Sequence, residues 1–150
     1  RNNHAHSVGR YGLRIFHEMV SREHPCQPTS AYDGSNMADP YHKNRPITNN
    51  FYNFTGWMNG RNCAIAKDVG DIRFNDFKCV DNLLAGVEIS LPQAYSALDE
   101  PQVRGGLFVG RSDANIYGPI DDASPNGIIT ARYENFGVTG SHFYNYNWNK

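Results

Sequence analysis

Histidines and aspartates are the side chains of this sequence that could bind a metal ion. His4 and His6 are two residues apart, so on an extended segment they share a face and could bind a metal. No third ligand is placed beside them, which favours surface histidines in a bend. Oxygen-rich corners could hold calcium, or their carboxylates could simply be solvated, at Asp68, Asp71, Asp76 and Asp81. We therefore predict no metal centre and no cofactor, with calcium as the one candidate ion.

Acidic residues could also cleave a glycan, which requires two carboxylates about 5–9.5 Å apart. In a coil of strands such a pair could arise from acids on neighbouring rungs, which lie about 4.8 Å apart. When the repeats described below are aligned, Glu88 falls beside Ile65 and Asp76 beside Phe51. No acid stacks on an acid, so we predict no catalytic residue. A hydrolase remains the alternative, with carboxylates supplied by loops at Asp33, Asp39, Asp113 or Asp121.

The elements that position these side chains are two alternating strand-like half-units. The first is Ile or Val followed five residues later by an aromatic, and it occurs at Ile47/Tyr52, Ile72/Phe77, Val103/Phe108 and Val138/Phe143. The second is Gly-apolar-x-apolar, and it occurs at 12–15 and 86–89, with looser copies at 63–66 and 127–130. Self-similarity at about 20–50 residues is typical of solenoids. The pattern predicts an all-β chain, a parallel β-helix, with a sandwich or jelly roll as the alternative.

Stacking the half-units in register predicts which residues meet. Ile47 should lie over Ile72, 25 residues later, and Tyr52 over Phe77. Ala64 should lie beside Val87 in the second half-unit. Corner asparagines Asn50 and Asn75 should stack and hydrogen-bond from rung to rung.

Proline-rich and polar stretches interrupt the repeat at 16–46, 90–102 and 111–126, which indicates loop insertions. We expect residues 1–150 to be one internal segment of a longer β-helix domain, because neither end shows a polar cap.

Composition favours an extracellular β protein. The net charge is −1 and charged residues make up 19% of the 150 residues, so no basic surface argues for nucleic acid. No apolar run of about 18 residues is present, so no membrane span is expected within the chain. Asn53-Phe54-Thr55 matches the N-glycosylation acceptor, and Asn53 should face solvent.

Three cysteines leave open one disulfide with one free thiol, or a partner outside the chain. Cys26, in a Pro-Cys-Gln-Pro loop, is the favoured disulfide former. Cys79 faces inward, where a buried free thiol is expected. The pairing of Cys26, Cys63 and Cys79 remains open.

Several segments resemble one extracellular family in the same order along the chain. They are Asn2-Asn3-x-Ala5-His6-Ser7, Tyr11-Gly12-Leu13-Arg14-Ile15, Lys78-Cys79-Val80-Asp81-Asn82-x-x-Ala85-Gly86-Val87, Gly106-Leu107-Phe108-Val109-Gly110 and Asn126-Gly127-Ile128. The sequence resembles the family of fibrocystin, fibrocystin-like proteins and the cell-migration-inducing hyaluronan-binding protein, which joins an eight-glycine domain to parallel β-helix repeats. The likeness spans about residues 2–146, and 10–16 with the Pro-Cys-Gln-Pro loop is more similar to the fibrocystin-like branch.

The resemblance implies a right-handed β-helix in a glycosylated, secreted or membrane-anchored ectodomain. It carries no catalytic residue onto this chain. The first functional hypothesis is a non-catalytic rod in a cell-surface or ciliary assembly, with structural, adhesive or glycan-binding roles. Its expected partners are other segments of the same protein, other surface or ciliary proteins, and glycans, but no nucleic acid. The alternative is part of a hyaluronan- or polysaccharide-degrading enzyme.

Overall fold

The computed structural model describes residues 1–21, 47–92, 101–114, 126–131 and 136–146, and these form strands, turns and bends but no helix. The strands make three sheets, all with parallel pairing. Sheet A contains β1 (His4–His6), β4 (Thr55–Trp57), β7 (Lys78–Val80), β10 (Leu107–Val109) and β13 (His142–Tyr144). Sheet B contains β2 (Tyr11–Met19), β5 (Asn62–Val69), β8 (Ala85–Pro92) and β11 (Asn126–Ile129). Sheet D contains β3 (Asn49–Tyr52), β6 (Ile72–Asn75), β9 (Gln102–Arg104) and β12 (Gly137–Thr139).

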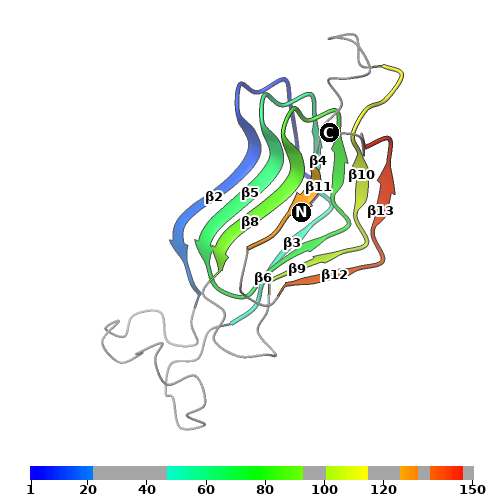
Figure 1. Cartoon of the computed structure of the whole chain (residues 1–150). Coiled ribbons are helices and arrows are strands. Elements are labelled where there is room, and N and C mark those ends of the chain that lie inside the picture. The colour runs from blue at the N-terminus through cyan, green and yellow to red at the C-terminus, as the bar shows by residue number, and fades with distance from the viewer. Residues whose placement is uncertain (22–46, 93–100, 115–125, 132–135, 147–150) are drawn as a thin grey trace, which may run out of the picture.

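The chain visits sheets D, A and B in turn and then starts again, so each circuit is one coil. Within each sheet, strands of successive coils lie side by side (Figure 1). Ala64 of β5 pairs with Val87 of β8, and Val87 pairs with Ile128 of β11. The protein is therefore a parallel β-helix, as the alternating half-units predict, and not a sandwich or jelly roll.

The predicted register of the first half-unit is wrong by two residues in the central coils. Ile72 pairs with Asn49 instead of Ile47, and Ile47 lies before β3 with 44% of its surface exposed. The aromatic over Phe77 is Phe54, whose ring centroid lies 5.4 Å away, and Tyr52 pairs instead with Asn75. The repeat between these central coils is accordingly 23 residues, as between Asn59 and Asn82.

The corner between sheets D and A explains this shift. One residue per coil takes a positive φ there, at Asn2, Asn53, Asp76, Gly105 and Gly140. Only Gly, Asn and Asp adopt this conformation at low cost. The position of this residue in each coil therefore fixes how neighbouring coils align at the corner. The residue after the corner then points inward, which buries Phe54 and Phe77 and leaves Tyr52 on the outer side.

The glycine half-unit follows from packing inside the coil. A Cβ added to Gly86 would lie 2.5 Å from Cδ1 of Phe108, which comes from the next coil. A Cβ added to Gly127 would likewise lie 2.5 Å from Cδ1 of Phe143, which also comes from the next coil. Each ring therefore occupies the space that a side chain on the preceding coil would fill, and the full burial of Phe108 contributes about 1.5–3 kcal/mol.

A disulfide occupies the equivalent place one coil earlier. Cys79 pairs with Phe108 in sheet A, and Cys63 stands between Asn62 and Ala64 of β5, which pair with Ala85 and Val87 around Gly86. Cys63 and Cys79 are joined to each other, with Cα atoms 5.6 Å apart. The prediction that Cys79 is a free thiol is therefore wrong. Cys26 lies outside the described residues.

The strands extend further into two of the predicted insertions than expected. β2 continues to Met19 and β8 continues to Pro92, so the insertions predicted at 16–46 and 90–102 begin in strands. Most of each insertion falls in 22–46, 93–100 and 115–125, outside the described residues. No helix among the residues with assigned structure is long and apolar enough to cross a bilayer.

Candidate functional site

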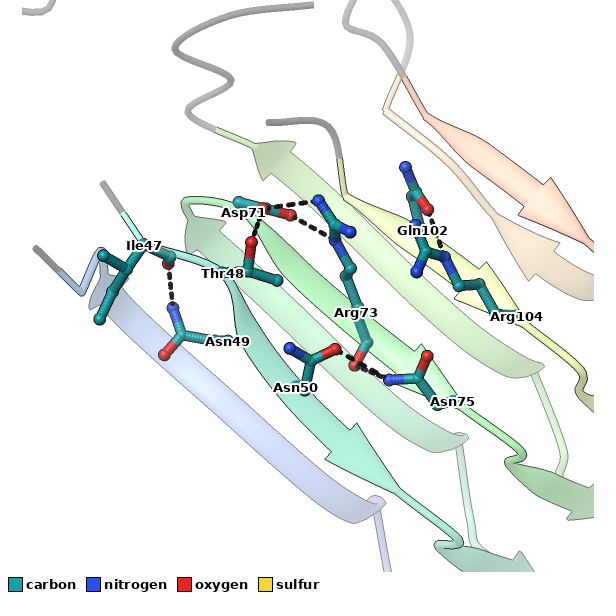
Figure 2. A network of polar contacts seen from close by, with 9 residues as sticks. All are labelled: Ile47, Thr48, Asn49, Asn50, Asp71, Arg73, Asn75, Gln102 and Arg104. Atoms are coloured by element: carbon teal, nitrogen blue, oxygen red, sulfur yellow. Dashed lines mark hydrogen bonds and ion pairs between the residues drawn. The ribbon is translucent and has the colours of Figure 1, made fainter. Parts of the chain in front are cut away.

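The outer face of sheet D carries a network of polar side chains on successive rungs (Figure 2). Asp71, just before β6, is 1% exposed. Arg73 donates two hydrogen bonds to its carboxylate, Nε to Oδ1 at 3.1 Å and Nη2 to Oδ2 at 2.9 Å. Thr48 Oγ1 from the neighbouring coil donates to Oδ2 as well. This buried charge is thus fully engaged by its own protein, which favours a structural role over ligand binding.

Asn50 and Asn75 meet on the same face, but not in the predicted register. Asn50 pairs with Arg73, and the Nδ2 of Asn75 crosses diagonally to donate to Asn50 Oδ1 at 3.2 Å. The same amide lies 3.2 Å from the carbonyl oxygens of Phe51 and Arg73. Asn75, 8% exposed, therefore stabilises backbone carbonyls of two coils.

The network continues into the next coil, where Arg104 Nε donates to Gln102 Oε1 at 2.5 Å. At the other end of this face, the Arg1 guanidinium lies 4.7 Å from the ring centroid of Tyr52. Most of these polar groups have a partner on the same face, so the outer side of sheet D is polar but largely self-paired.

A second asparagine pair lies at the corner between sheets A and B and was not foreseen from the sequence. Asn59 and Asn82 are 1% and 2% exposed. Asn59 Nδ2 donates to Asn82 Oδ1 at 2.8 Å, and Asn82 Nδ2 lies within hydrogen-bonding distance of the carbonyls of Gly56 and Val80. The 23-residue spacing of this pair is a signal that could have corrected the register.

The four aspartates considered for calcium are spread over three corners, with Asp68 and Asp71 at the one between β5 and β6. Asp71 is held by Arg73 as above, and Asp81 accepts hydrogen bonds from Ser112 N and Oγ, both at 2.6 Å. Asp68 and Asp76 both have positive φ and lie at the end of β5 and at the corner after β6. Within the described ranges, no three His, Cys, Asp or Glu side chains gather as metal ligands.

His4 and His6 contact an aromatic ring. They flank Ala5 on β1, and the His6 ring stacks on Trp57 with centroids 4.4 Å apart, while the His4 centroid lies 6.1 Å from it. His4 and His6 are therefore placed on one face, as predicted, beside an indole that binds no metal.

Carboxylates of a hydrolytic site are not brought together in the described part of the chain. Ile65 pairs with Glu88 as predicted. Asp76, however, follows the pair Tyr52–Asn75 and so aligns with Asn53, not with Phe51. Asp113 is exposed, and Asp33, Asp39 and Asp121 lie outside the described residues.

The sequon asparagine stands on an outer corner. Asn53 is exposed, has a φ of 53° and belongs to the aligned corner between sheets D and A. Its Nδ2, the atom that a glycan would occupy, donates to Asn2 Oδ1 at 3.0 Å. Thr55 lies in β4 between β1 and β7.

Cations and aromatic rings alternate on the strands β2 and β5 of sheet B. The Arg14 guanidinium lies 4.4 Å from the Phe16 ring centroid and 5.9 Å from that of Tyr11. Arg61 lies 5.9 Å from Tyr11, and Lys67 Nζ lies 5.8 Å from Phe16. We call Tyr11, Arg14, Phe16, Arg61 and Lys67 the β2–β5 cation cluster. The net charge of −1 hides this local excess of one sign, so the cluster is not evident from the sequence alone.

One further side chain has a perturbed acidity. Burial raises the pKa of the Tyr146 phenol above its ordinary value, and its ring packs on Phe143 with centroids 6.3 Å apart. Tyr146 is therefore a packing residue at the edge of the interior and stays protonated at neutral pH.

Comparisons with known proteins leave the chain without an assigned family. No protein-family model matches it, and no curated protein or solved structure shows a significant match.

Proposed function

We propose that this chain is a β-helix segment of a large extracellular, fibrocystin-like protein at the cell or ciliary surface, where it has a structural and adhesive role. The observation that carries the proposal is the cross-link inside the coil, the Cys63–Cys79 disulfide. Disulfides persist in oxidising compartments such as the cell exterior. A stack in which each coil contacts only its neighbours makes an extended rod with repetitive outer faces, a shape suited to displaying binding surfaces.

Glycosylation at Asn53 belongs to the same proposal. The exposed corner position leaves room for a glycan, and replacing the contact with Asn2 Oδ1 costs at most one exposed hydrogen bond, worth about 0.5–1.5 kcal/mol. A glycan there would project from the edge between sheets D and A, away from the β2–β5 cation cluster on sheet B.

The test is expression of the whole chain through a secretory pathway. We expect secreted protein whose mass falls on enzymatic removal of N-glycans, with Cys63 and Cys79 protected from alkylation until a reductant is added. Thr55→Val removes the sequon while keeping a β-branched residue in β4, and Thr55→Ser retains it. Glycan loss in the first variant alone confirms Asn53 as the acceptor.

Two outcomes would count against the proposal. One is free, alkylatable Cys63 and Cys79 in folded protein from the oxidising pathway. The other is turnover of a polysaccharide by the chain that is lost on replacing Asp113, which would favour the hydrolase alternative. No contact among the described residues favours that alternative, so we do not develop it further.

A further inference from the structure

The β2–β5 cation cluster combines three features that ordinary surface charges lack. Two of its cations lie on adjacent parallel strands, since Arg14 of β2 pairs with Ile65 and Lys67 of β5 pairs with Phe16, while Arg61 immediately precedes β5. Its rings are accessible: Phe16 is 51% exposed and Tyr11 is partly exposed. Each cation lies within 6 Å of a ring centroid, a distance at which the negative face of the ring attracts it.

Positive charge is concentrated here, and none of the three cations forms an ion pair with a described acid. Arg61 and Asn62 donate their backbone N–H groups to the carbonyl of Arg10, so Arg10 and Arg61 occupy neighbouring rungs, and both are exposed. Like charges on adjacent rungs destabilise a sheet. Asp68 follows Lys67 at the end of β5, and Glu88, which pairs with Ile65, accepts a hydrogen bond from Asn62. In the described part of the chain the only ion pair is that of Arg73 with Asp71.

The rings also hold the cations in place. Long cationic side chains lose up to about 2 kcal/mol of rotamer freedom on binding a ligand. Side chains already resting on aromatic rings have lost part of that freedom, so binding costs less. A cluster of partly ordered, unpaired cations beside exposed rings is therefore arranged for a polyanionic chain with apolar faces, and a sugar ring provides such a face.

We propose that the β2–β5 cation cluster binds a sulfated polysaccharide. This rests on the proposed extracellular, adhesive function and specifies the class of partner that the surface would bind. Guanidinium groups form charge-assisted, often bidentate hydrogen bonds with planar or tetrahedral oxyanions. The cluster places Arg14 between two rings, with Arg61 beyond one and Lys67 beyond the other, so its charges are closely spaced. A sulfated chain matches this density, whereas an unsulfated polyuronate carries a charge on alternate sugars only.

The experiment uses the whole chain, purified as a folded secreted protein, and measures its affinity for three probes of matched length. The probes are a heparin oligosaccharide, an unsulfated hyaluronan oligosaccharide and a double-stranded DNA oligomer. We expect the tightest binding to heparin, with an affinity that falls steeply as salt rises, because the contacts are between exposed charges.

Arg14→Ala/Arg61→Ala should weaken heparin binding about tenfold or more, since each charged hydrogen bond contributes on the order of 1.5 kcal/mol or more and 1.4 kcal/mol is a factor of ten. The matched control is Arg104→Ala together with Arg111→Ala, which removes the same charge elsewhere and should change affinity less than about twofold. Thermal unfolding of each variant verifies that it is folded. Phe16→Leu should weaken binding less, because it removes the ring but keeps an apolar side chain.

Four results would overturn the proposal: no heparin binding, equal loss in the cluster and control variants, equal affinity for hyaluronan, or tighter binding to DNA. Equal loss would indicate a diffuse charge effect, and tighter DNA binding would indicate a nucleic-acid surface. Secretion, glycosylation and the disulfide are measured on the same preparation. The extracellular assignment can therefore fail or hold separately from the sulfated-glycan assignment.

Discussion

The outer side of sheet D and the β2–β5 cation cluster are both rich in arginine, but the arginines have different partners. On sheet D, Arg73 binds the buried carboxylate of Asp71 and Arg104 binds Gln102. On sheet B, Arg14 and Arg61 contact aromatic rings and form no ion pair with a described acid. A polar residue satisfied by its own protein stabilises the fold, whereas an unpaired, accessible cation leaves its hydrogen bonds for a ligand. One face thus holds the coils together, and the other is available for binding.

The largest expected loss of stability comes from removing the disulfide in the interior of the coil, which lies under neither face alone. Cys63→Ala/Cys79→Ala removes the disulfide that links β5 to β7 across a sequence separation of 16. We expect a loss of about 3 kcal/mol in the free energy of unfolding, the value for a closed loop of this length. Denaturant titration measures it. An unchanged midpoint would show that the cross-link is not formed or not needed.

The next effect tests whether sheet D is structural. Asp71→Ala leaves Arg73 and Thr48 without their shared acceptor, and we expect a loss of about 2–3 kcal/mol in the free energy of unfolding. Asp113→Ala is the matched control, because Asp113 is exposed and its loss should cost less than about 0.5 kcal/mol. Equal stability of the two variants would contradict the distinction between the two faces.

A smaller difference in stability is expected between substitutions of the two paired asparagines, Asn75 and Asn50. Asn75→Ala removes an amide near three acceptors on two coils, and we expect about 1–2 kcal/mol of destabilisation. Asn50→Ala removes one acceptor from an exposed position and should cost about 0.5 kcal/mol. If Asn50→Ala proved the more damaging, the diagonal contact would not describe the corner in solution.

The smallest effect on stability is expected at the cation cluster. Arg14→Ala should change the free energy of unfolding by about 0.5 kcal/mol, the value of an exposed cation–π contact. Binding of the heparin probe by the same variant should fall severalfold. A destabilisation as large as that of Asp71→Ala would mean that the cluster is structural too, and the difference between the faces would disappear.

The sequence predicts the fold class well because its signals are local and repeated. Alternating apolar residues fix which side of a strand faces inward, and Gly86 marks a place where the backbone must accept a large ring. Both signals can be recognised within a single repeat, without knowing which residues lie beside it in the fold. The register of Ile47 was misassigned because a shift of two residues preserves the inward and outward alternation. The corner conformation at Asn53 and the 23-residue spacing of Asn59 and Asn82 exclude that shift.

The candidate sites were less predictable, because each depends on residues from different coils. Asn75 and Asn50 were identified as a pair, yet their diagonal contact requires the true register. Cys79 was taken for a free thiol because its partner, Cys63, occupies a glycine position in the other half-unit. The cation cluster joins residues 11–16 to residues 61–67, about fifty positions along the chain, and nothing in either segment indicates the other.

By itself, the sequence determined that this chain winds into parallel coils, since the periodic alternation of apolar, glycine and corner residues is a property of each repeat alone. The tertiary structure decided which repeats face which. That choice set the 23-residue register, joined Cys63 to Cys79, paired Asp71 with Arg73 and left Arg14 and Arg61 on aromatic rings. The physical reason is that contacts between coils depend on side-chain volume and charge at positions distant in sequence, which no single repeat contains.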